Sequence, residues 1–426
     1  MQTTTGIGIN HLRLNERIEQ LSRIGRIGET GVCRLALTPE DMEGIIQVRL
    51  WMEEAGLVTR LDPFGNLIGR LEGTDPAQPI LMIGSHIDSQ PYGGRYDGAI
   101  GVLGGLEAVQ CLMESGLQPP MPIEVVAFCD EEGSRFNKGL FGSRGMTGQL
   151  EDGELERQDR NGVTRREALE AFGCSVEKFA EGVYAPNSIG SYLELHIEQG
   201  PVLESLDAPV GLVTGISGPL WLTITIKGMA GHAGSVPMAM RHDALVGSAR
   251  VIAAFDDMVR ADPAAPTVGT VGSLRVFPDS RNIIPEEVSF TLDLRDMEMD
   301  RRNQLEARLM NVLAEVCSQH GLTYSVAEDT NSEPRYCAER IKAAIRSSAA
   351  EMDLSLPELM SGPFHDALAL SYACDYGMIF VRSKDGISHH PSEYSFPEDI
   401  ALGTEVLYRT IRQICGQLPA DDESEG

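Results

Sequence analysis

The 426-residue chain has no CxxC pair among its eight cysteines, and no apolar run approaches 18 residues. Cysteines at that spacing would favour a zinc or redox site, and an apolar run of that length would favour a membrane-spanning helix. The first residues also lack the basic region and the apolar core of a signal peptide. We therefore expect reduced structural thiols, no membrane partner and a cytoplasmic location.

Positive charge is scarce as well. Lys and Arg together number 35 against 63 Asp and Glu, which gives a formal net charge of −28. This balance argues against nucleic acid or an anionic membrane as a partner. With 426 residues and 42% hydrophobic content, the chain is long enough for two or three domains around a large core.

Short apolar runs separated by helical patterns indicate an α/β fold. The runs at 80–83, 123–128 and 377–381 are typical of strands buried in a mostly parallel sheet, and a further strand pattern covers 191–196. A helical pattern begins after Gly98, so Asp97 is expected where a loop enters a helix. Open sheets of this kind place their sites beyond the carboxyl ends of the strands.

A different pattern occupies the middle of the chain. Apolar and polar residues alternate at 222–227 and 288–295, which is typical of strands with one covered face. We predict an inserted α+β domain at 213–329, and a catalytic domain made of 1–212 and 330–426, because apolar strands resume after the insertion.

Imidazole and carboxylate groups follow the predicted strands of the catalytic domain. They are His86, Asp97, Glu131, Glu132, His196 and the His389-His390 pair. Zinc accepts His nitrogen and carboxylate oxygen, and five such residues that share one carboxylate fit two metals roughly 3.5 to 4 Å apart. The alternative for His86 alone is a structural histidine at a strand end.

The adjacent Glu131 and Glu132 call for separate roles. Neighbours in an extended segment point in opposite directions, so they do not easily bind the same ion. One is expected to be a ligand, and the other a base that takes a proton from water. The alternative for this segment is a solvated turn.

Five motifs, spread over nearly the whole chain, resemble a known family. They are GSHID at 84–88, GGRYDG at 93–98, DEEGSRF at 130–136, ELHIEQGP at 194–201 and SHHPSE at 388–393. Together they resemble the dinuclear-zinc amidohydrolases that cleave ureido compounds, nearest to the N-carbamoyl-L-amino-acid hydrolase branch. That branch is related to β-ureidopropionase and allantoate amidohydrolase.

The resemblance implies a ligand set. Asp97 would bridge two divalent metals, with zinc as the first candidate and Mn²⁺, Co²⁺ or Ni²⁺ as substitutes. Glu131 would be the general base. His389 is preferred over His390 because the family's ligand stands two places before the proline. The remaining ligands would be His86, Glu132 and His196.

The resemblance also implies substrate contacts and a partner. His232 would polarise the substrate, Asn282 would supply an amide contact, and Arg295 would clamp the substrate carboxylate. Gln199 is a further substrate-binding candidate. The inserted domain, expected to be ferredoxin-like, would act as a lid and join two chains in a homodimer.

Arg295 has a separate physical argument. It lies on the polar face of an alternating strand, and a guanidinium group binds a free carboxylate through two parallel hydrogen bonds. The alternative is a surface arginine paired with Asp293 or Asp296.

The predicted reaction is the hydrolysis of the ureido C–N bond of N-carbamoyl-L-amino acids to L-amino acid, CO2 and ammonia. The alternatives are allantoate amidohydrolase, β-ureidopropionase, and a protein that binds without turnover or serves as a dimerising scaffold. One segment departs from the family: 361–366 reads SGPFHD where small residues are usual. Because of Phe364, the shape of the substrate pocket does not follow from the resemblance. His365 is a candidate for a residue that supports the metal ligands.

Overall fold

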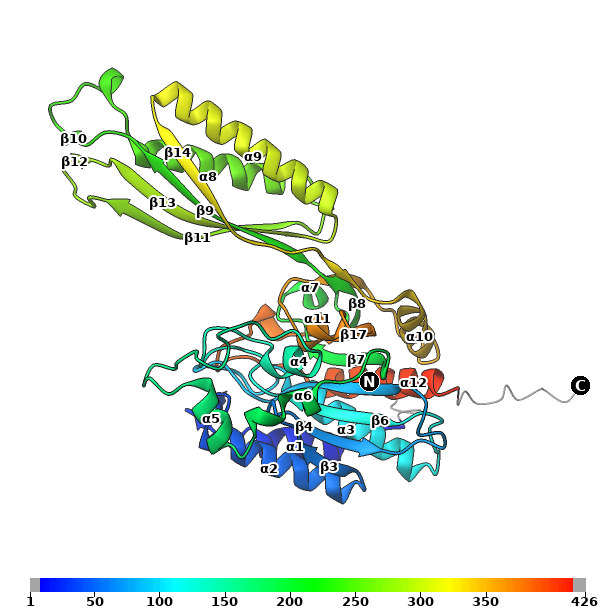
Figure 1. Cartoon of the computed structure of the whole chain (residues 1–426). Helices are drawn as coiled ribbons and strands as arrows, with labels where there is room; N and C mark the ends of the chain where they lie inside the picture. The colour runs from blue at the N-terminus through cyan, green and yellow to red at the C-terminus, as the bar shows by residue number, and fades with distance from the viewer. Residues whose placement is uncertain (1–7, 417–426) are drawn as a thin grey trace, which may run out of the picture. The chain divides into compact units, whose positions relative to one another are not determined.

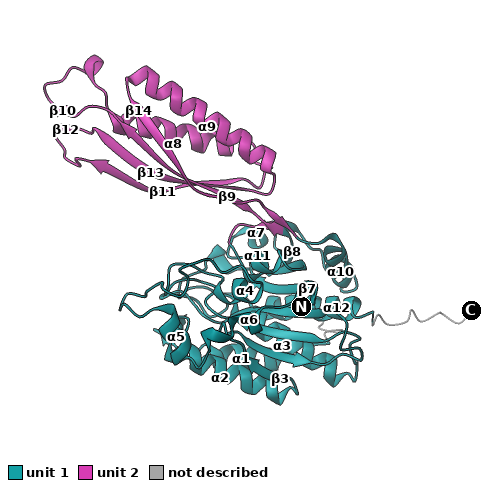
Figure 2. Ribbon diagram, viewed as in Figure 1, with its two compact units in different colours: residues 1–214, 337–359, 364–426 teal, residues 215–336, 360–363 magenta. Residues whose placement is uncertain are grey.

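The computed structural model of the chain describes residues 8–416, which form two compact units (Figures 1 and 2). The ends of the predicted catalytic segments, 1–7 and 417–426, lie outside the described part. Unit 1 comprises the described residues of 1–214, 337–359 and 364–426, and unit 2 comprises 215–336 and 360–363.

A mixed nine-stranded sheet has the order β15-β8-β17-β7-β5-β6-β4-β3, with β16 paired to β8. Its four central strands, β17, β7, β5 and β6, run parallel, and antiparallel strands flank them. The predicted α/β class is confirmed. The strands are β3 (Val58–Leu61), β4 (Leu67–Leu71), β5 (Ile80–His86), β6 (Ile123–Phe128), β7 (Ile189–Ile197), β8 (Val210–Ile216), β15 (Arg335–Tyr336), β16 (Glu358–Ser361) and β17 (Asp375–Val381).

The central strands are apolar, which allows helices to pack on the sheet and bury them. Every residue of β5 and of β6 is buried, as expected for parallel strands packed on both faces. Among the helices, α3 contacts β5 and β7, and α12 contacts β17. The helices of unit 1 are α1 (His11–Leu21), α2 (Pro39–Glu54), α3 (Ala99–Glu114), α4 (Phe141–Met146), α5 (Arg165–Ala171), α6 (Phe179–Gly182), α7 (Val202–Ser205), α10 (Glu339–Ala350), α11 (Asp366–Leu370) and α12 (Pro397–Ile414).

A small hairpin, which the sequence analysis did not predict, supports the site. Its strands are β1 (Arg26–Ile27) and β2 (Gly31–Val32). Val32 exchanges backbone hydrogen bonds with Gly93 at 3.0 Å in each direction. The hairpin thus holds the loop that leads to Asp97.

Unit 2 is an antiparallel sheet with helices against it. Its strand order is β11-β13-β9-β14, and burial alternates along β9 and β13 as the period-two pattern predicts. The α+β character of the insertion is confirmed. Its elements are β9 (Gly218–Lys227), β10 (Gly231–His232), α8 (Ala244–Arg260), β11 (Val268–Phe277), β12 (Ile283–Ile284), β13 (Glu287–Asp296), α9 (Met299–His320) and β14 (Thr323–Asn331).

Between residues 8 and 416, no helix combines the length and the apolar character that crossing a membrane requires.

Candidate metal centre

One edge of the unit 1 sheet collects side chains from four neighbouring strands. Because β17, β7, β5 and β6 are parallel neighbours, their carboxyl ends lie together. His86 ends β5 and His196 lies at the end of β7, while the other groups stand in the loops after β6 and β17 and before α3. The collected side chains are those of His86, Asp97, Glu131, Glu132, His196 and His389.

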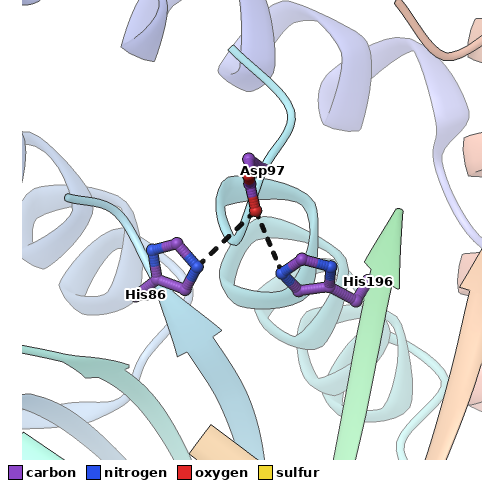
Figure 3. Close-up of side chains that lie close together, drawn as sticks. All are labelled: His86, Asp97 and His196. Carbon is purple, nitrogen blue, oxygen red and sulfur yellow. Dashed lines mark ion pairs between the residues drawn. The ribbon is translucent and has the colours of Figure 1, made fainter. Parts of the chain in front are cut away.

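Asp97 lies between two imidazole rings (Figure 3). Its Oδ1 is 3.7 Å from Nε2 of His86 and 3.2 Å from Nε2 of His196. All three residues are buried, and one ligand atom from each lies within 4.8 Å of the others. This first group has the composition and spacing of a metal site with nitrogen and oxygen ligands.

The other oxygen of Asp97 belongs to a second group. Oδ2 of Asp97 is 3.1 Å from Nε2 of His389, and that nitrogen is 3.5 Å from Oε2 of Glu132. These three residues also bring ligand atoms within 4.8 Å of one another. Asp97 therefore presents one oxygen to each group, as a carboxylate that bridges two metals does.

In the first group, each imidazole ring is oriented by a hydrogen bond at Nδ1, the nitrogen that does not face Asp97. Nδ1 of His86 lies 2.9 Å from the carbonyl oxygen of Asp88, and Nδ1 of His196 lies 3.0 Å from that of Ile197. A carbonyl only accepts, so each Nδ1 carries the proton and each Nε2 is directed at Asp97. Metal-binding histidines are commonly oriented in this way.

The charge of the cluster favours cations. Burial raises the pKa of Asp97, but the hydrogen bonds from His196 and His389 together hold that pKa well below its usual range. Burial lowers the pKa of His196, yet Asp97, Glu194 and the carbonyl of Ile197 together outweigh burial and raise that pKa to about 9. Burial raises the pKa of Glu132 to about 8, with a further contribution from Asp97. Burial lowers the pKa of His86 to about 4, so that imidazole stays neutral and able to act as a ligand. Further negative charge is resisted, and these imidazole and carboxylate groups fit a pair of divalent cations.

Gly98 permits the approach of Asp97 to His86. Its φ is +64°, in the left-handed region, and a Cβ built there would lie 2.4 Å from the His86 ring. A side chain would therefore be strained by the backbone and would collide with the imidazole. The glycine caps the N-terminal end of α3, where the helical pattern was predicted to begin.

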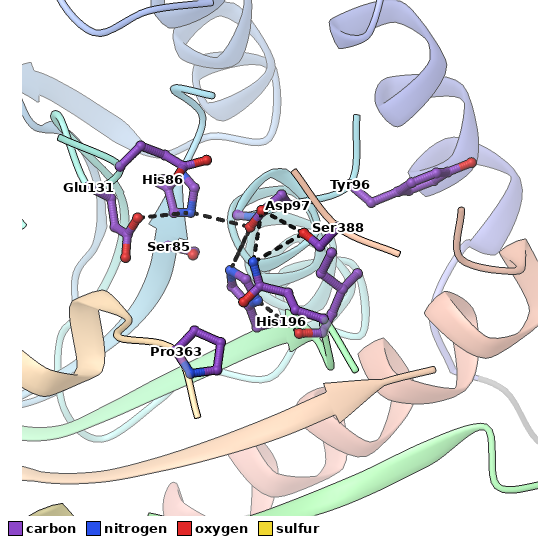
Figure 4. Close-up of polar contacts among 12 residues, drawn as sticks. Ser85, His86, Tyr96, Asp97, Glu131, His196, Pro363 and Ser388 are labelled. Atoms are coloured by element: carbon purple, nitrogen blue, oxygen red, sulfur yellow. Dashed lines mark hydrogen bonds and ion pairs between the residues drawn. The ribbon is translucent and has the colours of Figure 1, made fainter. Parts of the chain in front are cut away.

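Glu131 and Glu132 have different surroundings. Oε2 of Glu131 is 3.7 Å from Nε2 of His86 (Figure 4). In contrast, Oε2 of Glu132 accepts a 2.6 Å hydrogen bond from Gln90 and lies 3.5 Å from Nε2 of His389. The carboxylate of Asp88 accepts from both backbone N–H groups, at 3.2 and 3.3 Å. Burial raises the pKa of Glu131 well above its usual value. Glu131 therefore stands beside the first group without sharing the contacts of Glu132.

Of the predicted substrate contacts, Gln199 lies at the cluster. Its Nε2 is 2.9 Å from Oδ2 of Asp97, 3.2 Å from Oγ of Ser388 and 3.3 Å from Nε2 of His389. Its Oε1 is buried and has no hydrogen-bond partner among residues 8–416. A buried acceptor without a donor is costly, so this atom marks a place where a donor from outside the chain is favoured.

The other predicted contacts belong to unit 2. His232 and Asn282 are neighbours there, because β10 pairs with β12 and the backbone N–H of Ala233 donates to the carbonyl of Asn282 at 2.8 Å. Arg295 donates to both oxygens of Asp293 and, at 2.6 Å, to the carbonyl of Gly362. The pairing with Asp293 considered as an alternative is therefore present in this structure.

The two remaining candidate histidines, His390 and His365, have different surroundings. Nδ1 of His390 accepts from the backbone N–H of Ser392, and its ring meets the edge of Tyr92, so it stands outside the two groups. The His365 ring is buried 4.3 Å from the His196 ring, and Glu194 completes a third group of ligand-type atoms with them. His365 thus lies beside the candidate ligand His196, in agreement with the prediction that it supports the site.

Four further polar residues belong to the site and were not predicted from the sequence: Asp88, Gln90, Ser388 and Glu393. Each is polar and hydrogen-bonded to a candidate ligand or to its backbone. All four lie within or beside the quoted motifs, which was the available signal. Their roles depend on which loop faces which, and spacing along one chain does not reveal that.

Comparison with known proteins gives consistent matches. The model of the family described as peptidase family M20/M25/M40 matches residues 82–413. An N-carbamoyl-L-amino-acid amidohydrolase of Pseudomonas sp. (strain NS671) is 47% identical over 413 residues, covering 96% of this chain and 99% of the relative. An allantoate deiminase of Arabidopsis thaliana is 33% identical, covering 92% of this chain and 81% of the relative.

Solved structures agree. The crystal structure of an amidase of the hydantoinase/carbamoylase family from Burkholderia multivorans matches with a TM-score of 0.89 and 35% identity, covering 97% of this chain and 100% of that one. The match includes both units, since it spans nearly all of each chain.

Proposed function

The chain belongs to peptidase family M20/M25/M40, and from this membership we propose that it is a metal-dependent amidohydrolase that cleaves the ureido C–N bond of N-carbamoyl-L-amino acids. The observation that carries the proposal is the position of Asp97 between two ligand groups. The greater identity to the N-carbamoyl-L-amino-acid amidohydrolase, 47% against 33% for the allantoate deiminase, favours an N-carbamoyl-L-amino acid over allantoate as the substrate.

Two divalent cations would be held at this centre. His86 and His196 would hold one, Glu132 and His389 the other, and Asp97 would contact both. Zinc is the first candidate, with Mn²⁺, Co²⁺ or Ni²⁺ as substitutes. When bound, such cations supply Lewis-acid polarisation and lower the pKa of water.

Glu131 would move the proton. As water adds to the carbamoyl carbon, the Glu131 carboxylate takes a proton from that water. The bond from that carbon to the amino-acid nitrogen then breaks, and Glu131 returns the proton to the departing amine. The carbamate that remains decomposes to CO2 and ammonia. Burial of this carboxyl group, which raises its pKa, favours a group that can hold a proton between the two steps.

The roles of the unit 2 residues rest on the resemblance. His232 and Asn282 would stabilise the developing oxyanion, and Arg295 would bind the substrate carboxylate. Gln199 of unit 1 would contact the substrate from beside Asp97. We also propose that the inserted unit acts as a lid and forms a homodimer, and the cytoplasmic location stays a prediction.

The substrate class is tested by comparing kcat/KM on metal-loaded protein. We expect N-carbamoyl-L-amino acids to exceed their D-enantiomers, dipeptides and allantoate, with N-formyl-L-amino acids as a weaker class. The two enantiomers have the same bonds and differ only in configuration at the α-carbon, so comparing their kcat/KM values tests how the side chain is placed in the pocket. Allantoate as the best substrate would move the chain to the alternative activity.

The carboxylate clamp has its own prediction. Arg295→Ala should lower kcat/KM about 10–100-fold on an N-carbamoyl-L-amino acid, because a hydrogen bond to a charged group contributes about 1.5 to 3 kcal/mol and 1.4 kcal/mol is tenfold. The matched control is the same compound with its carboxylate replaced by an amide. The variant should lose the preference for the acid, whereas equal losses on both compounds would show that Arg295 acts only through its bonds to Asp293 and Gly362.

A further inference from the structure

Glu393 is a buried carboxylate without a role in the chemistry described above. It is 3% exposed. Its Oε1 accepts hydrogen bonds from the backbone N–H groups of Tyr96 and Asp97, at 2.9 and 3.1 Å. Its Oε2 accepts from the hydroxyl of Ser388 at 3.0 Å. Both oxygens are therefore directed at the loops that carry candidate ligands.

These bonds join two parts of the chain that are far apart in sequence. Glu393 stands 297 positions from Tyr96. One of its oxygens fixes the backbone of the Asp97 loop, and the other fixes the residue that precedes His389. The Ser388 hydroxyl also lies 3.1 Å from Oδ2 of Asp97, so the same carboxylate borders the second ligand group.

The chain leaves room for this carboxylate at Gly94. A Cβ built on Gly94 would lie 2.2 Å from the carboxyl carbon of Glu393 and 2.5 Å from its Cβ. Carbon atoms cannot approach so closely, so any side chain at this position would displace Glu393. Gly94 thus supplies a way to move the carboxylate without changing its chemistry.

The His389 turn depends on such support. His389 has a φ of +53°, a conformation that costs a residue other than glycine about 1–3 kcal/mol and persists only where the surrounding structure imposes it. The His389 side chain is 47% exposed, whereas the His86 and His196 side chains are 2% and 1% exposed. The second group is therefore held by fewer neighbours than the first.

We propose that Glu393 is a positioning residue that holds the Asp97 and His389 loops together, and so sets metal affinity mainly at the Glu132–His389 position. The proposal rests on the proposed function, because it requires that the two groups bind metal. Loss of a residue that orients a metal ligand typically weakens metal binding about 10–100-fold. The His86–His196 position should be affected less, since its rings are held by the carbonyl groups of Asp88 and Ile197, which do not depend on Glu393.

The test is a titration of metal-free full-length protein with Zn²⁺ against a chelating dye, together with elemental analysis after gel filtration. Wild type should bind two ions. In Glu393→Ala, one ion should bind with wild-type affinity and the second about 10–100-fold more weakly. Gly94→Ala should give the same pattern, and it carries the test if Glu393→Ala does not fold. Glu393→Gln, which keeps an acceptor for the two N–H groups, should stay within a few fold of wild type.

Glu405 offers a matched control. It is also a buried glutamate of unit 1, 1% exposed, and accepts from the backbone N–H groups of Gly8 and Ile9 at 2.7 and 3.1 Å. Glu405→Ala should keep both metals. Loss of metal in this control, equal weakening of both ions in Glu393→Ala, or two ions of wild-type affinity in that variant would each overturn the proposal. A wild-type protein that binds no metal would instead reject the proposed function.

Discussion

Glu131→Gln is expected to keep wild-type metal content and to lose about 10²–10⁴-fold in kcat, the range for removal of a general acid–base group. The amide has nearly the same size but cannot take a proton from water. Glu131 is not a member of either group of ligand-type atoms around Asp97, so metal content should not depend on it.

The measurement is kcat on an N-carbamoyl-L-amino acid beside elemental analysis of the same sample. Glu132→Gln is the matched comparison, because it changes the adjacent carboxylate that faces His389. That variant should lose metal as well as rate. Near-native turnover in Glu131→Gln would show that another group moves the proton.

Asp97→Asn is expected to remove both metals and to abolish activity. Each Asp97 oxygen faces a different group, at 3.2 Å from His196 and 3.1 Å from His389, so one substitution alters both positions. Affinity should fall more than about 100-fold, since loss of a group that merely orients a ligand already costs about 10–100-fold.

The check on Asp97→Asn is the metal titration with Zn²⁺, accompanied by circular dichroism to confirm folding. Glu405→Gln is a suitable control, because that buried carboxylate bonds to Gly8, Ile9 and Arg409 and to no candidate ligand. Two bound ions in Asp97→Asn would mean that the carboxylate does not bridge.

The central strands and the edge that carries the site were predictable from the sequence. Apolar runs ending in polar turns placed β5, β6 and β17, and the parallel arrangement followed from burial on both faces. The start of α3 was predictable from Gly98 and the helical spacing after it. These features depend on residues that are close together in the chain.

The supporting contacts were not predictable because they join distant segments. Gln90 bonds to Glu132, and Glu393 bonds to Tyr96, through pairings that only the folded loops create. The β1–β2 hairpin is too short to give a periodic signal. Arg295 shows a related limit: both a substrate clamp and a pair with Asp293 suit a polar strand face, and the structure contains the pair.

The most direct test of the account is a titration of chelator-treated protein with Zn²⁺, in which ammonia release from an N-carbamoyl-L-amino acid is followed at each addition. The two groups that share Asp97 predict activity that is absent without metal and reaches its plateau at two ions per chain. Manganese, cobalt or nickel should also restore it. Full activity in protein shown by elemental analysis to hold no metal would contradict the account.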